Sequence, residues 1–417
     1  MNAARPPLKS LDDALAELLA RARLLEGVEP VSTFDADGRV LAEDLVSPLQ
    51  VPPQDNSAMD GYAVRAREIA DEGVLLPVSQ RIPAGSAAQP LEPGSAARIF
   101  TGAPVPPGAD AIVMQEDTQA DGEQSVRILR VPEAGQWIRR GGEDVMRGAI
   151  VLARGERLGP ASLGLAAGIG RATLPVVRRP RVALFSTGDE LVMPGTVAPE
   201  AMPAGAIYNS NRFFLRALLL RLGCVVSDCG IVPDRLDATV DALRSAAVGH
   251  DLILTSGGVS VGEEDHIKPA VQQTGALTQW QIAMKPGKPF ACGEVRPAGA
   301  GQAAAAHFIG LPGNPVSSFI TFLLLVRPFL LKLQGARVLV PQPVQLPAHF
   351  DWPRADRRRE FLRVRRNGAG GLDLFANQSS GVLTSTVWGD GLVDNPPGQR
   401  IACGDTVRFT AFSEWLA

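Results

Sequence analysis

Lysine is scarce in this sequence, and its positions are uneven. The 417 residues include 41 basic side chains, of which five are lysines, and three of these lie between positions 268 and 288. Lys285 and Lys288 belong to the string MKPGKPF, in which two prolines stiffen a turn. Because a stiff turn loses little conformational entropy when its side chains bind, the pair predicts a site for phosphate or another oxyanion. A solvated surface turn is the competing explanation.

A second group of polar residues follows an apolar segment in the string TSGGVSVGEEDHIK. Its glycines let backbone N–H groups face an anion, its serines add hydroxyl donors, and the helix expected after it adds a positive N-terminus. The acidic residues would ordinarily cap that helix, but Asp265 is the better candidate for a ligand because Lys268 shares its face. The candidates are Ser256, Gly257, Gly258, Ser260 and Asp265.

Two further strings have the same form, an apolar segment that ends in a glycine turn. FSTGDELVMPG carries Asp189 and Glu190, and paired carboxylates can hold Mg²⁺ together with water and a substrate phosphate. GLPGNPVSSF places Pro312 before a turn, Pro315 at a helix start and Ser317 in the first helical turn, which suits phosphate. Taken singly, each string would be interpreted as a structural turn.

The elements expected around these strings would bring them together. From residue 180 onwards, apolar segments of strand length alternate with helix-length segments, which predicts a central parallel α/β sheet with helices on both faces. Ligands of such sheets bind at the carboxyl ends of the strands, where the four strings would meet. Hydroxyls, lysines, backbone donors and carboxylates at one edge predict a phosphorylated substrate and a metal-assisted reaction.

The rest of the chain indicates a multidomain protein that combines this α/β unit with β domains. Residues 10–25 have the spacing of a helix, and two regions alternate short apolar runs with Gly/Pro turns. The expected division is an N-terminal helical and linking region (1–54 and 146–178), an inserted β-rich domain (55–145), the α/β domain (179–333) and a C-terminal β-barrel or sandwich (334–417).

Composition excludes several classes of protein. The net charge of −3 argues against a nucleic-acid or membrane-surface partner. The four cysteines have no C-x-x-C spacing and there are only four histidines, so a structural zinc site is not expected. The longest apolar run is interrupted by Arg327 and Pro328 and falls short of a membrane span. With no signal-peptide pattern at the N-terminus, these features predict a cytoplasmic protein.

Taken together, the strings resemble the molybdopterin molybdenumtransferase family, which comprises the bacterial MoeA proteins and the E domain of gephyrin. DNSAMDGYAV, TGAPVPPGAD, GEDV, FSTGDEL, NSN, TSGGVSVGEED, KPGKPF, GLPGNP and NQSSG occur in the order of the family, between about residues 10 and 410. The resemblance implies an elongated four-part subunit and a homodimer, with the active cleft between the α/β domain of one subunit and the inserted domain of the other. It also implies a reaction that inserts molybdate into adenylylated molybdopterin and releases AMP with Mg²⁺.

The resemblance also assigns roles to residues. It implies Mg²⁺ and substrate ligands at Asp189, Glu190 and Asp265, and phosphate or molybdate binding at Lys285 and Lys288. The remaining positions implied as catalytic or substrate-binding are Asp60, Thr101, Arg139 and Asp144 from the inserted domain, Pro312 and Pro315 from the GLPGNP loop, and Arg358 from the R-x-E-F-x-R pattern of the last domain. Expected protein partners are a molybdopterin adenylyltransferase and chaperones of molybdoenzymes.

Two other functions remain open at this point. A molybdopterin adenylyltransferase would share the SGG-type loop, but such enzymes lack the inserted domain that carries DNSAMDGYAV and GEDV. A non-catalytic molybdopterin-binding scaffold is the other alternative, because the gephyrin E domain also clusters receptors. Carboxylates and lysines at every expected strand end argue against a purely structural protein.

Overall fold

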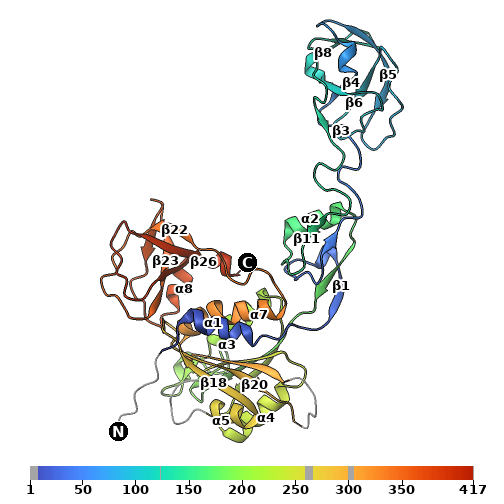
Figure 1. Ribbon diagram of the computed structural model, residues 1–417. Coiled ribbons are helices and arrows are strands. Elements are labelled where there is room, and N and C mark those ends of the chain that lie inside the picture. The colour runs from blue at the N-terminus through green and yellow to red at the C-terminus, as the bar shows by residue number, and fades with distance from the viewer. Residues whose placement is uncertain (1–7, 123, 259–265, 299–304, 417) are drawn as a thin grey trace.

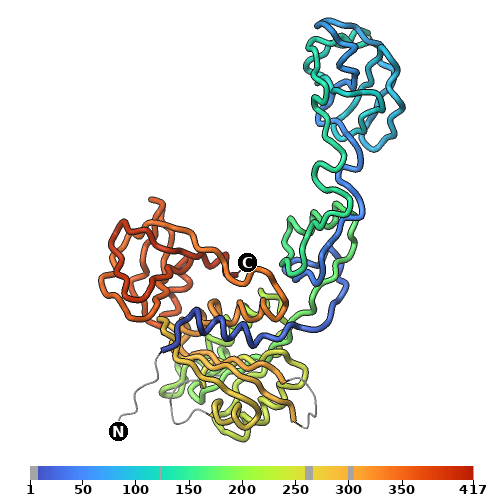
Figure 2. Tube along the Cα trace, in the orientation of Figure 1, coloured from blue at the N-terminus to red at the C-terminus, as the bar shows by residue number. Residues whose placement is uncertain are grey.

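The computed structural model describes residues 8–122, 124–258, 266–298 and 305–416. In these parts the chain forms two adjoining lobes and a long arm that carries a further β domain at its tip (Figure 1). The Cα trace shows that an outgoing and a returning segment of the chain build the arm (Figure 2).

A six-stranded sheet forms the centre of the α/β lobe. Four neighbouring strands are parallel, but β20 is antiparallel to both of its neighbours, so the predicted parallel sheet is wrong and the sheet is mixed. Residues 282–288 alone separate β18 from β20, whereas a parallel connection needs about a dozen residues or more. In spatial order the strands are β16 (Val225–Val232), β13 (Arg181–Thr187), β17 (Leu252–Ser256), β21 (Ala306–Leu311), β20 (Pro289–Val295) and β18 (Gly275–Gln281).

Helices cover both faces of this sheet (Figure 1). One hydrophobic core joins the first face to α1 (Leu11–Ala20), α3 (Asn211–Arg221), α6 (Pro315–Thr321) and α7 (Arg327–Leu333). A second core joins the other face to α4 (Leu236–Ala246) and α5 (Ile267–Thr274). Helix α1 begins within the range expected from the sequence, where the Ser10 hydroxyl accepts a 3.0 Å hydrogen bond from the backbone of Asp13, but it ends at Ala20 and is shorter than the predicted 10–25. Its packing places α1 in the α/β lobe, whereas the sequence division had grouped it with the linking region.

The apolar run interrupted by Arg327 and Pro328 is a core helix. It comprises α6, a π-helical stretch (Phe322–Val326) and α7, and the wider π turns accommodate Pro328, which has no N–H to donate. Arg327 is buried and donates to the carbonyl oxygens of Trp415 at 2.7 Å and Leu339 at 2.9 Å. Within the described ranges, this helix alone is long and apolar enough to cross a membrane. However, 89% of its apolar stretch is buried inside the protein.

The arm consists of paired segments from distant parts of the sequence. Strand β1 (Val28–Ser32) pairs with β12 (Thr173–Val177), and β2 (Leu45–Val46) pairs with β11 (Ile150–Leu152), beside α2 (Pro160–Gly168). At the tip, one sheet has the order β7 (Ala111–Met114), β4 (Gly61–Val64), β6 (Ala96–Ile99), β5 (Leu75–Ile82), β9 (Ser125–Ile128) and β8 (Thr118–Ala120). Strands β3 (Asn56–Ser57) and β10 (Ile138–Arg139) pair at its base. Short 3₁₀ turns occupy Thr33–Asp35, Ala66–Glu68 and Gln115–Asp117, and another occupies Pro199–Ala201 beyond the arm.

The C-terminal lobe is a small sheet that bends back on itself. A bridge between Ala348 and Leu372 links the chain just after β22 to β24, so the ladder returns close to its first strand. The strands are β22 (Val344–Pro347), β23 (Arg359–Arg366), β24 (Leu372–Leu374), β25 (Gly391–Asn395) and β26 (Thr406–Ala411), with α8 (Thr384–Trp388) and α9 (Phe412–Leu416) beside them. Strand β19 (Met284–Lys285) joins this sheet from the α/β lobe.

Candidate functional site

A cavity of about 770 Å³ opens where β13, β17 and β21 end. Two short strands, β14 (Leu191–Val192) and β15 (Ile207–Tyr208), contribute to one side together with the start of α3, and the C-terminal lobe contributes Gly381. The cavity therefore lies at the carboxyl edge of the parallel strands, as the sequence predicts. The predicted site residues that line it are Glu190, Ser256, Gly257, Gly258, Pro312, Pro315 and Ser317.

The loop after β17 requires its two glycines. Gly257 has φ +97° and Gly258 has φ +66°, a region that side chains other than glycine rarely adopt. A Cβ atom on Gly258 would lie 2.6 Å from Cγ1 of Ile267, and one on Gly257 would lie 2.8 Å from the carbonyl oxygen of Thr187. Both glycines line the cavity, so their backbone can approach a bound group closely.

Asn211 fixes two loops of the cavity to each other. Its Nδ2 atom donates to the Ser256 hydroxyl at 2.8 Å and to the carbonyl oxygen of Gly313 at 2.7 Å. One side chain at the start of α3 thus joins the loop after β17 to the loop after β21. The sequence interpretation gave Asn211 no role beyond membership of the NSN string, because its two partners are distant in the sequence.

Two buried polar atoms in the cavity wall indicate a polar ligand. The Thr187 hydroxyl and the Nδ2 atom of Asn209 are buried and have no hydrogen-bond partner within the described chain. Such atoms are rare in native proteins, since leaving a buried donor unpaired costs about 1–3 kcal/mol. Both residues line the cavity, so these unpaired atoms lie next to the space that a ligand with acceptor oxygens would occupy.

Two of the predicted metal ligands, Asp189 and Glu190, lie at the rim of this cavity. Asp189 and Glu190 directly follow β13 and are exposed, and Asp189 Oδ1 accepts a 3.3 Å hydrogen bond from the backbone of Asp234. Two carboxylates beside a polar cavity fit Mg²⁺, which keeps several waters and binds substrate phosphates. Among the described residues, no three His, Cys, Asp or Glu side chains are close enough to form a metal cage. Asp265 and Ser260 lie outside the described residues.

The predicted lysines have different surroundings. Lys285 belongs to β19, which pairs with β23, and its ammonium lies 3.1 Å from Glu360 Oε1 and 3.5 Å from Asp356 Oδ2. Arg358 is paired with the same Asp356 at 2.8 Å. Lys288 has no ion-pair partner within the part of the chain that the structure describes. None of these cations lines the cavity itself, although the backbone of Val316 donates to Ser380 and so holds the C-terminal lobe beside it.

The four predicted residues of the inserted domain belong to the chain segment between β3 and β11, which forms the arm, whereas the cavity is built by the α/β lobe and Gly381 (Figure 1). Asp60 Oδ1 accepts 2.7 Å hydrogen bonds from both the backbone and the hydroxyl of Thr101, and these bonds lower the pKa of Asp60. Arg139 and Asp144 are exposed on the nearby returning segment. A single chain therefore does not bring this group to the sheet edge.

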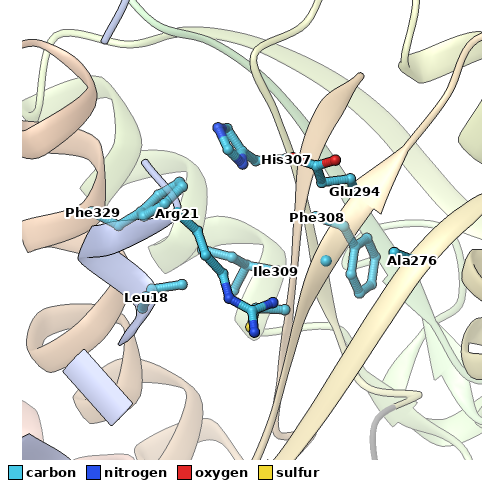
Figure 3. Close-up of a pocket in the computed structure, with 10 residues that line it drawn as sticks. Leu18, Arg21, Ala276, Glu294, His307, Phe308, Ile309 and Phe329 are labelled. Atoms are coloured by element: carbon cyan, nitrogen blue, oxygen red, sulfur yellow. The ribbon is translucent and has the colours of Figure 1, made fainter. Parts of the chain in front are cut away.

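A second cavity, of about 230 Å³, lies between α1 and the antiparallel edge of the sheet (Figure 3). Leu18, Ile309 and Phe329 contribute apolar walls, and Arg21 donates to Glu17 at 2.7 Å and Thr278 at 3.1 Å. None of the predicted site residues lines this space. It is separate from the candidate site.

Three family models match the chain in order. The MoeA N-terminal region (domain I and II) matches residues 9–170, a probable molybdopterin binding domain matches residues 183–332, and the MoeA C-terminal region (domain IV) matches residues 345–412. The molybdopterin molybdenumtransferase of Haemophilus influenzae is 37% identical over 98% of this chain and 99% of its own length. The chain belongs to the MoeA family.

Solved structures agree with this assignment. The molybdopterin biosynthesis MoeA protein of Pyrococcus horikoshii OT3 matches with a TM-score of 0.83 and 29% identity, over 97% of this chain and 100% of that one. Gephyrin of Dictyostelium discoideum is 32% identical over 78% of this MoeA chain and 49% of gephyrin. The resemblance drawn from the sequence strings is confirmed, including the relationship to gephyrin.

Proposed function

We propose that this chain, a molybdopterin molybdenumtransferase of molybdenum cofactor biosynthesis, inserts molybdate into adenylylated molybdopterin and releases AMP with the help of Mg²⁺. The observation that carries the proposal is the cavity at the carboxyl edge of the sheet, with its glycine loop and its unpartnered donors at Thr187 and Asn209. A phosphate-bearing, polyanionic substrate would meet fixed donors there and would not require them to reorganise.

In this proposal, the cavity binds the pterin and its phosphate groups. The backbone of Gly257 and Gly258 and the hydroxyls of Ser256 and Ser317 would hold phosphate oxygens, and Pro312 and Pro315 would keep the GLPGNP loop rigid. The dithiolene of the substrate supplies the sulfur ligands for molybdenum. The protein therefore needs no nucleophile, and its residues act by binding and orienting the reactants.

Lys285, Lys288 and Arg358 would hold the oxyanion. Three cations at the border between the α/β and C-terminal lobes provide the charge-assisted donors that molybdate requires. Asp189 and Glu190, with Asp265, would hold Mg²⁺, which neutralises negative charge on the phosphate groups when it is bound. Those carboxylates would hold the metal, and the metal would in turn bind oxygens of the substrate phosphates.

The position of the arm supports a homodimer. Asp60, Thr101, Arg139 and Asp144 can complete the site only if the arm of one subunit reaches the cavity of another. The four-part division expected from the sequence, a cytoplasmic location, and contacts with a molybdopterin adenylyltransferase and molybdoenzyme chaperones belong to the same proposal. Separate hydrophobic cores in the linking part of the arm, at its tip and within the C-terminal lobe support most of this division, whereas one further core joins α1 and part of the C-terminal lobe to the α/β lobe.

The test is a purified molybdenum insertion assay with quantified AMP release. Lys288→Ala and Asp265→Asn should fold normally but lose about tenfold to hundredfold in insertion rate, since each removes one charge-assisted contact. Lys332→Ala is the matched control, because Lys332 lies in the last turn of the core helix, roughly 25 Å from its start at the cavity. Wild-type insertion rates in both site variants would show that the assignment is wrong, and ATP-dependent adenylylation of molybdopterin would favour the adenylyltransferase instead.

A further inference from the structure

Lys285 lies in a polar cluster that the C-terminal lobe completes. Because β19 pairs in parallel with the start of β23, Lys285 stands opposite Glu360 in the ladder. The lysine ammonium is within ion-pair distance of the carboxylates of both Glu360 and Asp356, and it lies 5.9 Å from the centre of the Trp352 ring. Two carboxylates therefore share one lysine.

Glu360 is the fixed carboxylate of this cluster. Its side chain is 1% exposed, and its Oε2 atom accepts hydrogen bonds from Trp352 Nε1 at 2.7 Å and from Asn395 Nδ2 at 3.4 Å. A buried carboxylate needs a counter-ion, and Lys285 is that cation. Glu360 therefore keeps its position and orients Lys285.

The side chain of Asp356 is more exposed than that of Glu360 and has different hydrogen-bond partners. Its side chain is 20% exposed, and it lies before β23 in a segment whose backbone is held by the carbonyl oxygen of Asp356, which accepts a 2.7 Å hydrogen bond from Gly398. Arg358 donates to its two carboxylate oxygens, from Nε at 3.1 Å and from Nη2 at 2.8 Å, and the backbone of Arg358 donates at 3.0 Å. These contacts, and the charge of Lys285, hold the pKa of the Asp356 carboxyl well below its usual range.

The donors around Asp356 form a set suited to oxyanions. A guanidinium fork beside an ammonium is the arrangement that binds tetrahedral oxyanions such as phosphate or sulfate. We propose that Asp356 is an internal competitor that sets the affinity of this site for molybdate. Its carboxylate holds Arg358 beside Lys285 before molybdate binds, and it moves away when the oxyanion takes its place. This inference rests on the proposed function, in which Lys285 and Arg358 bind molybdate.

The local nature of the contacts permits this exchange. Asp356 lies before the first residue of β23 and contacts Arg358, two residues away. Rotation of the Asp356 side chain therefore breaks no strand pairing. Molybdate carries two negative charges and four oxygens, so it can satisfy Arg358 and Lys285 together better than one carboxylate does. A monovalent anion such as chloride has neither advantage, and Asp356 would exclude it from the site.

The experiment measures molybdate binding to the purified full chain by titration calorimetry at fixed ionic strength. Asp356→Asn should bind molybdate about threefold to tenfold more tightly than the wild type, because a partly exposed ion pair no longer competes. The control is Asp390→Asn, which removes the same charge from a carboxylate paired with Arg366 in the same lobe. Its affinity for molybdate should be unchanged. Asp356→Ala serves as a second variant, and thermal unfolding verifies that each protein is folded.

The outcomes separate this inference from the proposed function. If both Asp356 variants bind molybdate as the wild type does or more weakly, and Lys285→Ala abolishes binding, then Asp356 is not a competitor. The proposed oxyanion site would remain supported. Equal tightening in Asp390→Asn would also overturn it, since the effect would then come from net charge. Wild-type molybdate binding by Lys285→Ala would overturn both the oxyanion site and the competitor.

Discussion

His307 shows how burial controls the charge of a single side chain. It lies on β21 with 5% of its surface exposed, and its ring meets the ring of Phe329 edge to face, with centres 5.1 Å apart. Figure 3 shows it beside the smaller cavity, near Glu294. Burial, with a contribution from the charge of Arg23, lowers the pKa of His307 to about 4.

This pKa predicts a pH dependence of stability. Between pH 6.5 and about 4 the unfolded chain binds a proton at His307 that the folded chain does not bind, so the free energy of unfolding falls as the pH falls through this range. We expect His307 to account for a loss of about 1–3 kcal/mol between pH 7 and 4.5. Urea unfolding of the wild type and of His307→Leu at several pH values measures it. Equal pH slopes in the two proteins would contradict the prediction.

Several site residues could be predicted because their chemistry is local. Gly257, Gly258, Glu190 and Ser317 follow strands or begin a helix within a few residues, and the structure places them around one cavity. Asn211 could not be found in this way, because its role depends on contacts with residues 45 and 102 positions away. No local pattern in a sequence encodes such a distance.

An ion pair strengthens the junction between the arm and the α/β lobe. Arg178, just after β12, donates to both carboxylate oxygens of Asp251 at 2.7 and 2.8 Å, and the backbone of Arg181 donates to Asp251 at 2.8 Å. Asp251 precedes β17, so the pair connects the returning segment of the arm to the sheet. The hydrogen bonds of Arg178 lower the pKa of Asp251 despite its burial.

Asp251→Ala should therefore weaken the α/β lobe. We expect the free energy of unfolding to fall by about 1–3 kcal/mol, because the substitution leaves a half-buried arginine without its charged partner. The matched control is Asp237→Ala in the Arg235–Asp237 pair, where Asp237 is 65% exposed and solvent screens the ion pair, so the loss should be much smaller. Denaturant unfolding followed by tryptophan fluorescence measures both. Similar losses in the two variants would contradict a structural role for the Arg178–Asp251 pair.

The positions of strands and helices are easier to predict from the sequence than the pairing and direction of the strands. The alternating pattern after residue 180 indicated the strands and helices of the lobe, but not that β20 is antiparallel to its neighbours. The direction of β20 follows from the short connection of residues 282–288, and strand direction has no signature in the hydrophobic pattern. The pairing of β19 with β23 was likewise hidden, because Lys285 and Glu360 lie 75 residues apart.

The predicted site residues are divided between the arm and the α/β lobe. Two inactive variants, one altered in each part, should therefore restore activity when they form a mixed dimer. Asp60→Ala removes a residue of the arm and Lys288→Ala removes one of the proposed oxyanion site, so in the proposed homodimer a mixed pair would contain one intact site. We expect each variant alone to be nearly inactive, and a refolded equal mixture to regain about a quarter of the wild-type insertion rate. Insertion assays before and after mixing measure this. No recovery in a mixture shown to contain mixed dimers would contradict a site shared between subunits.

The pairing of distant segments also sets the order in which the protein can fold as it leaves the ribosome. The tip of the arm uses residues 56–139 and needs nothing synthesised later, so it can fold early. Strand β1 must wait for β12, and α1 can pack against α7 only after a segment more than 300 residues further along the chain has been made. The apolar face of α1 therefore stays exposed in the nascent chain long after the helix itself has been synthesised.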